Sequence, residues 1–180
     1  MKKCLALILI VLVLAVGCGS EPDNKSQADK PGQPESVSQV ALVHRFSALM
    51  SQIGNPADVM IRNLGEKVLD RDAGRETTEN LVAYAIDTAE ECRTLVHIID
   101  AAPIPEGTRP DVADMCKQAA WQFKQGYTKT ADGIDMLIEG VQTESGEANR
   151  SFKEHWQSAR QHFSNAAHCL ENALKKARQP

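Results

Sequence analysis

Three cysteines are the side chains of this sequence best suited to chemistry. Cys92, Cys116 and Cys169 stand far apart in the chain, each within an apolar stretch that has helical spacing. If neighbouring helices alternate in direction, Cys92 and Cys116 lie within about one helical turn of each other in height, at roughly 1.5 Å per residue. The sequence therefore predicts a Cys92–Cys116 disulfide worth roughly 3 kcal/mol. A Cys92–Cys169 disulfide, with Cys116 free, is the alternative.

The same three cysteines could instead hold a metal ion, because thiolates suit zinc and copper(I). Closed zinc sites usually show paired ligands such as Cys-x-x-Cys, and no such pair occurs here. Three histidines that could complete a site project away from the apolar stripes of their helices, namely His44, His97 and His168. We therefore expect no metal site, and Cys92, Cys116 and Cys169 remain the weaker alternative.

Two further histidines, His155 and His162, lie seven residues apart on one flank of the last helical stretch. The histidines of a metalloprotease helix stand four apart with a Glu between them, so this spacing favours a polar stripe beside the core. A c-type haem needs Cys-x-x-Cys-His, which is missing. A b-type haem could use Met50 or Met115 with His162, although methionine at helical spacing more often fills a core. We expect no cofactor, and a metal- or haem-binding bundle is the alternative function.

The charges and motifs of the chain argue against two classes of function, although an enzyme whose site residues converge only in space would show no such motif. Its 180 residues include 20 Lys and Arg against 24 Asp and Glu, for a net charge of −4. No basic excess is present to neutralise phosphates, so we expect no binding to nucleic acid. There is no G-x-S-x-G, no glycine-rich phosphate loop and no H-E-x-x-H. We therefore predict that the protein is not an enzyme.

The elements that must position these residues are helices. Apolar side chains recur at helical spacing in four stretches, over residues 42–68, 81–99, 112–141 and 152–177. The first is interrupted at Gly54-Asn55-Pro56, which predicts one kinked helix or two short ones. Short loops between the stretches make adjacent helices antiparallel. The fold class is therefore all-α, an antiparallel up-down four-helix bundle with a kinked or broken first helix.

One aromatic side chain does not fit the core pattern. Trp121 lies on the opposite side of its helix from Cys116, away from the apolar stripe. Tryptophan is enriched among the residues that anchor protein interfaces, so Trp121 is a candidate for a partner surface or for self-association. The alternative is that the first helix wraps over this side and buries it.

The N-terminus predicts export. Met1-Lys2-Lys3 is cationic, and the apolar run from Cys4 to Val16 is shorter than the roughly 20 residues of a membrane-spanning helix. The ending Leu14-Ala15-Val16-Gly17-Cys18 resembles the lipobox of bacterial lipoproteins. In that family the cysteine is diacylated at sulfur, becomes the mature N-terminus and is usually then N-acylated. Ala15 stands where the lipobox usually has Leu, so the ordinary signal peptidase, cutting the same bond and leaving Cys18 a plain thiol, is the alternative.

The resemblance implies a domain organisation and a location. Residues 1–17 are the cleaved signal peptide, residues 18–36 are the lipidated Cys18 and a tether, and residues 37–180 are the helical bundle domain. The polar composition of residues 19–36 is typical of disorder, with a reach of roughly 20–25 Å. The expected location is the cell envelope, lipid-anchored to a membrane; in a Gram-negative cell, Gly19 favours the periplasmic face of the outer membrane. Disulfides are permitted there, and we expect a non-enzymatic interaction or structural protein.

Overall fold

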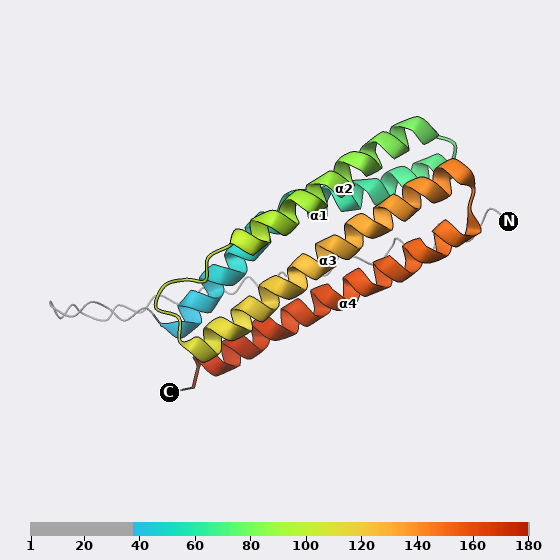
Figure 1. Cartoon of the computed structure of the whole chain (residues 1–180). Coiled ribbons are helices and arrows are strands. Elements are labelled where there is room, and N and C mark those ends of the chain that lie inside the picture. The colour runs from blue at the N-terminus through green and yellow to red at the C-terminus, as the bar shows by residue number, and fades with distance from the viewer. Residues whose placement is uncertain (1–37, 180) are drawn as a thin grey trace.

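Four helices make up the structure, a computed structural model that describes residues 38–179. They are α1 (Gln39–Asp72), α2 (Thr78–Ala101), α3 (Pro110–Thr143) and α4 (Gly146–Ala177). Successive helices run in opposite directions along one elongated bundle (Figure 1), and residues 38–179 contain no strand. The predicted all-α, antiparallel four-helix bundle is confirmed. The predicted signal peptide, Cys18 and the tether lie outside the described residues.

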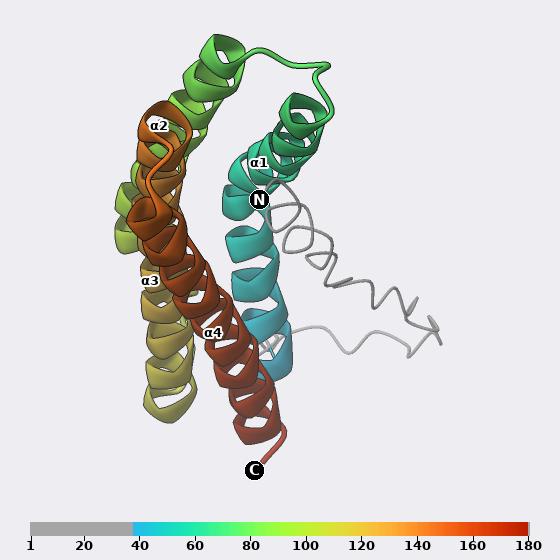
Figure 2. The same cartoon turned by 90° about the vertical axis from the view of Figure 1, so that its right-hand side faces the viewer.

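The first helix is continuous. Of the two forms that the sequence allowed, the structure has the single helix, with Pro56 inside it and no new helix beginning at Asn55 (Figure 2). Pro56 removes one backbone hydrogen bond from α1. Buried residues on both sides of it, Met50 and Ala57, belong to one core cluster. Packing on both sides of the proline therefore keeps the two halves in one helix.

The core consists of two groups of buried side chains, stacked along the bundle. The first surrounds Phe46, Cys116 and Tyr127 toward the end where α1 begins. The second surrounds Leu64 and Trp156 at the opposite end. We call the end at which α1 begins the entry end and the opposite end the distal end. Within residues 38–179, both the first and the last helix of the bundle thus contribute to the core.

Glycines bring α3 and α4 close together. Gly126, Gly133 and Gly140 recur every seven residues along the side of α3 that faces α4. A Cβ atom added at Gly126 would lie 2.6 Å from the Phe163 ring, and one at Gly133 would lie 3.3 Å from the His155 Cβ. Only glycine permits this approach at Gly126 without movement of the ring, so α3 and α4 pack closely along this side.

Helix α2 is shorter than α3 and covers only its distal part. Asp100, next to the last residue of α2, pairs with Lys124, and Arg93 pairs with Asp135. The start of α3 at Pro110 lies well beyond the end of α2. Residues 102–109 therefore continue past the end of α2 toward the entry end to reach it (Figure 1). This offset decides where the cysteines lie.

Candidate functional site

The two cysteines predicted to pair are far apart along the bundle axis. Because Arg93 pairs with Asp135, the neighbouring Cys92 lies beside the part of α3 around Ile134. Cys116 lies near the other end of α3, roughly 25 Å away at 1.5 Å per residue. A disulfide needs Cα atoms within about 7 Å. The predicted Cys92–Cys116 disulfide is not formed in the structure, and both cysteines are free thiols. The reason is that α2 ends well before it reaches the level at which α3 begins.

Cys169 lies near Cys116 in height and far from Cys92. On α4, His162 contacts Gln122 of α3, with 2.8 Å between Nδ1 and Oε1. Seven residues further along α4, Cys169 is therefore level with the part of α3 around Cys116. The alternative Cys92–Cys169 disulfide is excluded by the same offset, and Cys169 is also a free thiol. The three cysteines cannot share one metal, and no group of three His, Cys, Asp or Glu within residues 38–179 could hold one.

The two buried thiols have low reactivity. Burial, together with the negative charges of Asp58 and Glu91, raises the pKa of Cys92 to about 12. Burial likewise raises the pKa of Cys116 to about 11. Since the thiolate is the reactive form, both side chains act as small core hydrophobes in the folded protein.

A polar contact joins α1 to α3 beside Cys92. The Tyr127 hydroxyl donates a hydrogen bond to Asp58 Oδ1 at 3.0 Å, while the Tyr127 ring is buried. Desolvation raises the pKa of the Asp58 carboxyl, although the Tyr127 hydrogen bond and the charge of Arg62 oppose the rise. Burial and the neighbouring Asp58 carboxylate raise the pKa of Tyr127. The arrangement positions α1 on α3.

Trp121 lies on the surface, as predicted. Its side chain is 54% exposed, so α1 does not cover it. The indole packs edge to face on the His162 ring, with ring centroids 6.0 Å apart and an interplanar angle of 82°. Gln161 and Asn165, one on each side of His162 in α4, are joined by a hydrogen bond of 2.9 Å. We call Trp121, Gln122, Gln161, His162 and Asn165 the Trp121 surface.

The histidines considered as ligands are spread over the molecule. His44, His97 and His168 are exposed, as expected from their positions off the apolar stripes. His155 approaches Asp132 at 3.8 Å, and His162 is engaged with Gln122. For the haem alternative, Met50 lies in the core cluster that α1 helps to form, whereas His162 lies on the Trp121 surface. The structure adds no observation in favour of a cofactor.

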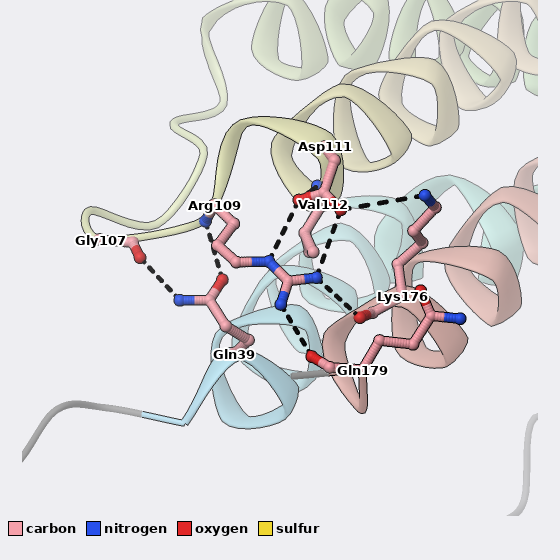
Figure 3. A network of polar contacts seen from close by, with 7 residues as sticks. All are labelled: Gln39, Gly107, Arg109, Asp111, Val112, Lys176 and Gln179. Atoms are coloured by element: carbon pink, nitrogen blue, oxygen red, sulfur yellow. Dashed lines mark hydrogen bonds and ion pairs between the residues drawn. The ribbon is translucent and has the colours of Figure 1, made fainter.

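A network around Arg109 fastens the entry end of the bundle (Figure 3). The guanidinium donates to the carbonyl oxygens of Lys176 and Gln179, both at 2.8 Å, and to the Asp111 carboxylate at 3.1 and 3.2 Å. The Arg109 backbone N–H donates to Gln39 Oε1 at 2.8 Å. One side chain thus joins the start of α3 to the end of α4, and its backbone joins both to the start of α1.

Sequence reasoning missed this network. Arg109 precedes Pro110, which marks the start of a helix, but its partners Gln39 and Lys176 are about 70 residues away in either direction. Nothing in the spacing of polar residues indicates such a meeting. The local signal that could be found is Asp111 in the first turn of α3, whose carboxylate suits a helix N-terminus.

Comparison with models of protein families, with curated proteins and with solved structures gave no match to this chain. Among the helices of residues 38–179, none has the length and apolar character needed to cross a membrane.

Proposed function

We propose that the protein is a bacterial lipoprotein of the cell envelope, held to a membrane through Cys18, that acts as a non-enzymatic interaction or structural protein. The anchor is supported by the lipobox-type sequence from Leu14 to Cys18. The observation that carries the interaction function is the 54% exposure of Trp121. A large aromatic side chain that is left in water and already held against His162 is suited to anchor a protein partner.

The position of Trp121 along the bundle supports a surface close to the membrane. Helix α1 begins at Gln39, which the Arg109 network fixes beside the start of α3. Trp121 lies 11 residues after Pro110, so it is roughly 17 Å from the entry end at 1.5 Å per residue. A tether with a reach of roughly 20–25 Å would then keep the Trp121 surface close to the membrane. The expected partner is a protein in or near that membrane, or a second copy of this chain.

The anchor is tested by the intact mass of the protein from a membrane fraction. A chain that begins at Cys18 with two or three acyl groups is the expected result. The Cys18→Ala variant should lose both the added mass and the membrane association. A mature chain that begins at Cys18 with a plain thiol would show that the ordinary signal peptidase acts instead, and it would overturn the anchor.

The partner surface is tested separately with Trp121→Ala. Ile98→Ala is the matched control, because Ile98 is a similarly exposed apolar side chain (44%) on α2. We expect Trp121→Ala to change the oligomeric state or the set of proteins that copurify from cross-linked cells, while Ile98→Ala leaves both as in the wild type. Equal behaviour of wild type and Trp121→Ala would count against the interaction function without touching the anchor.

A further inference from the structure

A second surface lies at the distal end, away from the Trp121 surface. An open groove of about 480 Å³ runs between the beginning of α2 and the end of α3. Val82, Ala83 and Ile86 form its α2 side and Val141 its α3 side. Ile86 is 44% exposed, although it lies in the half of the bundle with a well-filled core. The groove therefore presents an apolar floor to water.

The two chain segments that include the groove residues carry acidic side chains and no basic ones. Residues 76–92 contain five acidic side chains and no basic one, and residues 136–149 contain three and none. Glu79 lines the groove itself. Asp87 and Glu90 follow Ala83 and Ile86 by one helical turn, so they continue the same face of α2.

Most of these carboxylates have no counter-charge. Among the eight, only Glu76 forms an ion pair with another side chain of residues 38–179. Of the basic residues next to these segments, Arg75, Arg93 and Lys129 already pair with other carboxylates, those of Asp70, Asp135 and Asp132. Arg150 directly follows residue 149, so eight acidic side chains stand against this one further basic neighbour. Unpaired carboxylates around an apolar floor give the groove a negative potential that favours a cationic ligand.

We propose that this groove binds a basic amphipathic helix of another protein. Val82 and Ile86 are four residues apart and match the i, i+4 spacing of apolar side chains on such a helix. Lysines or arginines flanking that apolar stripe would lie over Glu79, Asp87 and Glu90. The proposal uses neither the lipid anchor nor the Trp121 surface.

A second copy of this chain fits the groove less well. Its own basic helical segment, Lys175 and Lys176 at the end of α4, lies at the entry end, where Lys176 approaches Asp111 and its carbonyl accepts from Arg109. The apolar neighbour of these lysines, Ala173, is fully buried in the core. That segment is therefore already packed and bonded within its own bundle, and it does not present an apolar face to the groove of a second copy.

The test is a binding titration of a fluorescein-labelled synthetic helix made of Lys and Leu, with Leu along one face. A Glu and Leu peptide with the same apolar face is the control ligand. The protein is the full chain carrying Cys18→Ala, so that no acyl group is present to bind the peptide. We expect the basic peptide to bind, the acidic peptide not to bind, and the affinity for the basic peptide to fall as salt increases.

Two isoleucine variants make the test specific. Ile86→Lys should weaken binding at least tenfold, because it removes an apolar contact and places a like charge in the groove. Ile98→Lys should change it less than twofold, since Ile98 has the same 44% exposure on the same helix but lies outside the groove. Circular dichroism melts of both variants check that they fold.

Three results would overturn the proposal. The first is equal binding of the basic and acidic peptides, and the second is an equal loss of binding in the Ile86→Lys and Ile98→Lys variants. The third is no binding of the basic peptide to the folded wild type. Sedimentation of the protein alone provides one more check: a dimer that Ile86→Lys dissociates would assign the groove to a second copy instead.

Discussion

The Tyr127 hydroxyl on α3 occupies the space that a side chain at position 54 of α1 would fill. A Cβ atom built on Gly54 would overlap the hydroxyl oxygen and lie 3.4 Å from the ring carbon that bears it. From this position the hydroxyl reaches Asp58, one turn further along α1, at 3.0 Å. The absence of a side chain at Gly54 is thus what permits the Tyr127 hydroxyl to approach α1 and bond to Asp58.

We predict that Gly54→Ala destabilises the bundle. Alanine gains up to about 1 kcal/mol of helix propensity over glycine, but overpacking at a buried position costs roughly 1–3 kcal/mol, and displacing Tyr127 costs roughly 1 kcal/mol more. The melting temperature should fall by a few degrees in a circular dichroism melt. Gly146→Ala is the control, because its new Cβ would meet no atom within 4 Å. An unchanged or higher melting temperature for Gly54→Ala would contradict the packing described here.

Gly54 shows which features of the fold can be predicted from the sequence and which cannot. The four helices and their apolar faces follow from side-chain periodicity, which depends only on neighbours in the chain. Gly54-Asn55-Pro56 has the composition of a helix break, and only the presence of Tyr127, 73 residues later, explains the glycine. Local patterns cannot show such a distant partner, so the sequence left a broken helix as an equal possibility.

The relative height of the cysteines could not be predicted for a related reason. Their positions within each helix were correctly placed in the core, since Cys92 and Cys116 are 0% and 1% exposed. Their relative height depends on how residues 102–109 connect two helices of different length. A loop that continues along the bundle cannot be distinguished in sequence from one that turns at once, and this difference places Cys92 roughly 25 Å from Cys116. The position of Trp121 off the apolar stripe could be predicted because it depends on the face of a single helix, and the structure shows the exposed one of its two possible surroundings.

The three thiols should differ sharply in reactivity. Cys169 is partly exposed, whereas Cys92 and Cys116 are buried, with the pKa of each raised, to about 12 and about 11. We expect iodoacetamide at pH 8 to alkylate Cys169 in the native protein and to leave the other two unmodified. After unfolding without reductant, peptide mass spectrometry should find all three alkylated. Recovery of Cys92 and Cys116 as a disulfide-linked peptide pair would contradict the offset of α2 and α3.

The start of α2 should weaken in acid. Lys67 donates to Glu76 at 2.7 Å, and the backbone N–H of Thr77 and the side chain of Asn80 donate to the same carboxylate at 3.0 and 3.1 Å. These contacts, led by that with Lys67, lower the pKa of Glu76 from 4.5 to about 2. A carboxyl group whose pKa is lowered by folding stabilises the protein above its unfolded pKa, and this contribution is lost as the pH falls toward about 2.

We therefore expect Glu76→Gln to lower the melting temperature at pH 7 and the difference from wild type to shrink steadily below pH 4.5. Thermal melts of both proteins between pH 2 and pH 7 measure it. Glu106→Gln is the matched control, because Glu106 is exposed and forms no ion pair with the rest of residues 38–179. A difference between Glu76→Gln and wild type that stays constant with pH would show that the carboxylate charge is not the cause.

Arg109 should act through geometry more than through charge. No other side chain easily replaces its guanidinium, because this planar group donates hydrogen bonds to two carbonyl oxygens and one carboxylate at once. We predict that Arg109→Lys keeps the charge beside Asp111 but frees the carbonyls of Lys176 and Gln179, at a cost of about 1–2 kcal/mol. The last turn of α4 should then fray.

Amide hydrogen exchange followed by mass spectrometry measures this fraying directly. In Arg109→Lys we expect faster exchange in the last turn of α4, while the centre of that helix, around Ala159, exchanges as in wild type. Lys117→Ala is the control, since its ion pair with Asp114 is about two-thirds exposed and should contribute little. Because Gln39 accepts from the backbone of Arg109 and not from its side chain, the start of α1 should remain protected. Equal protection of α4 in Arg109→Lys and wild type would mean that the apolar contacts of its last turn hold the helix without the guanidinium.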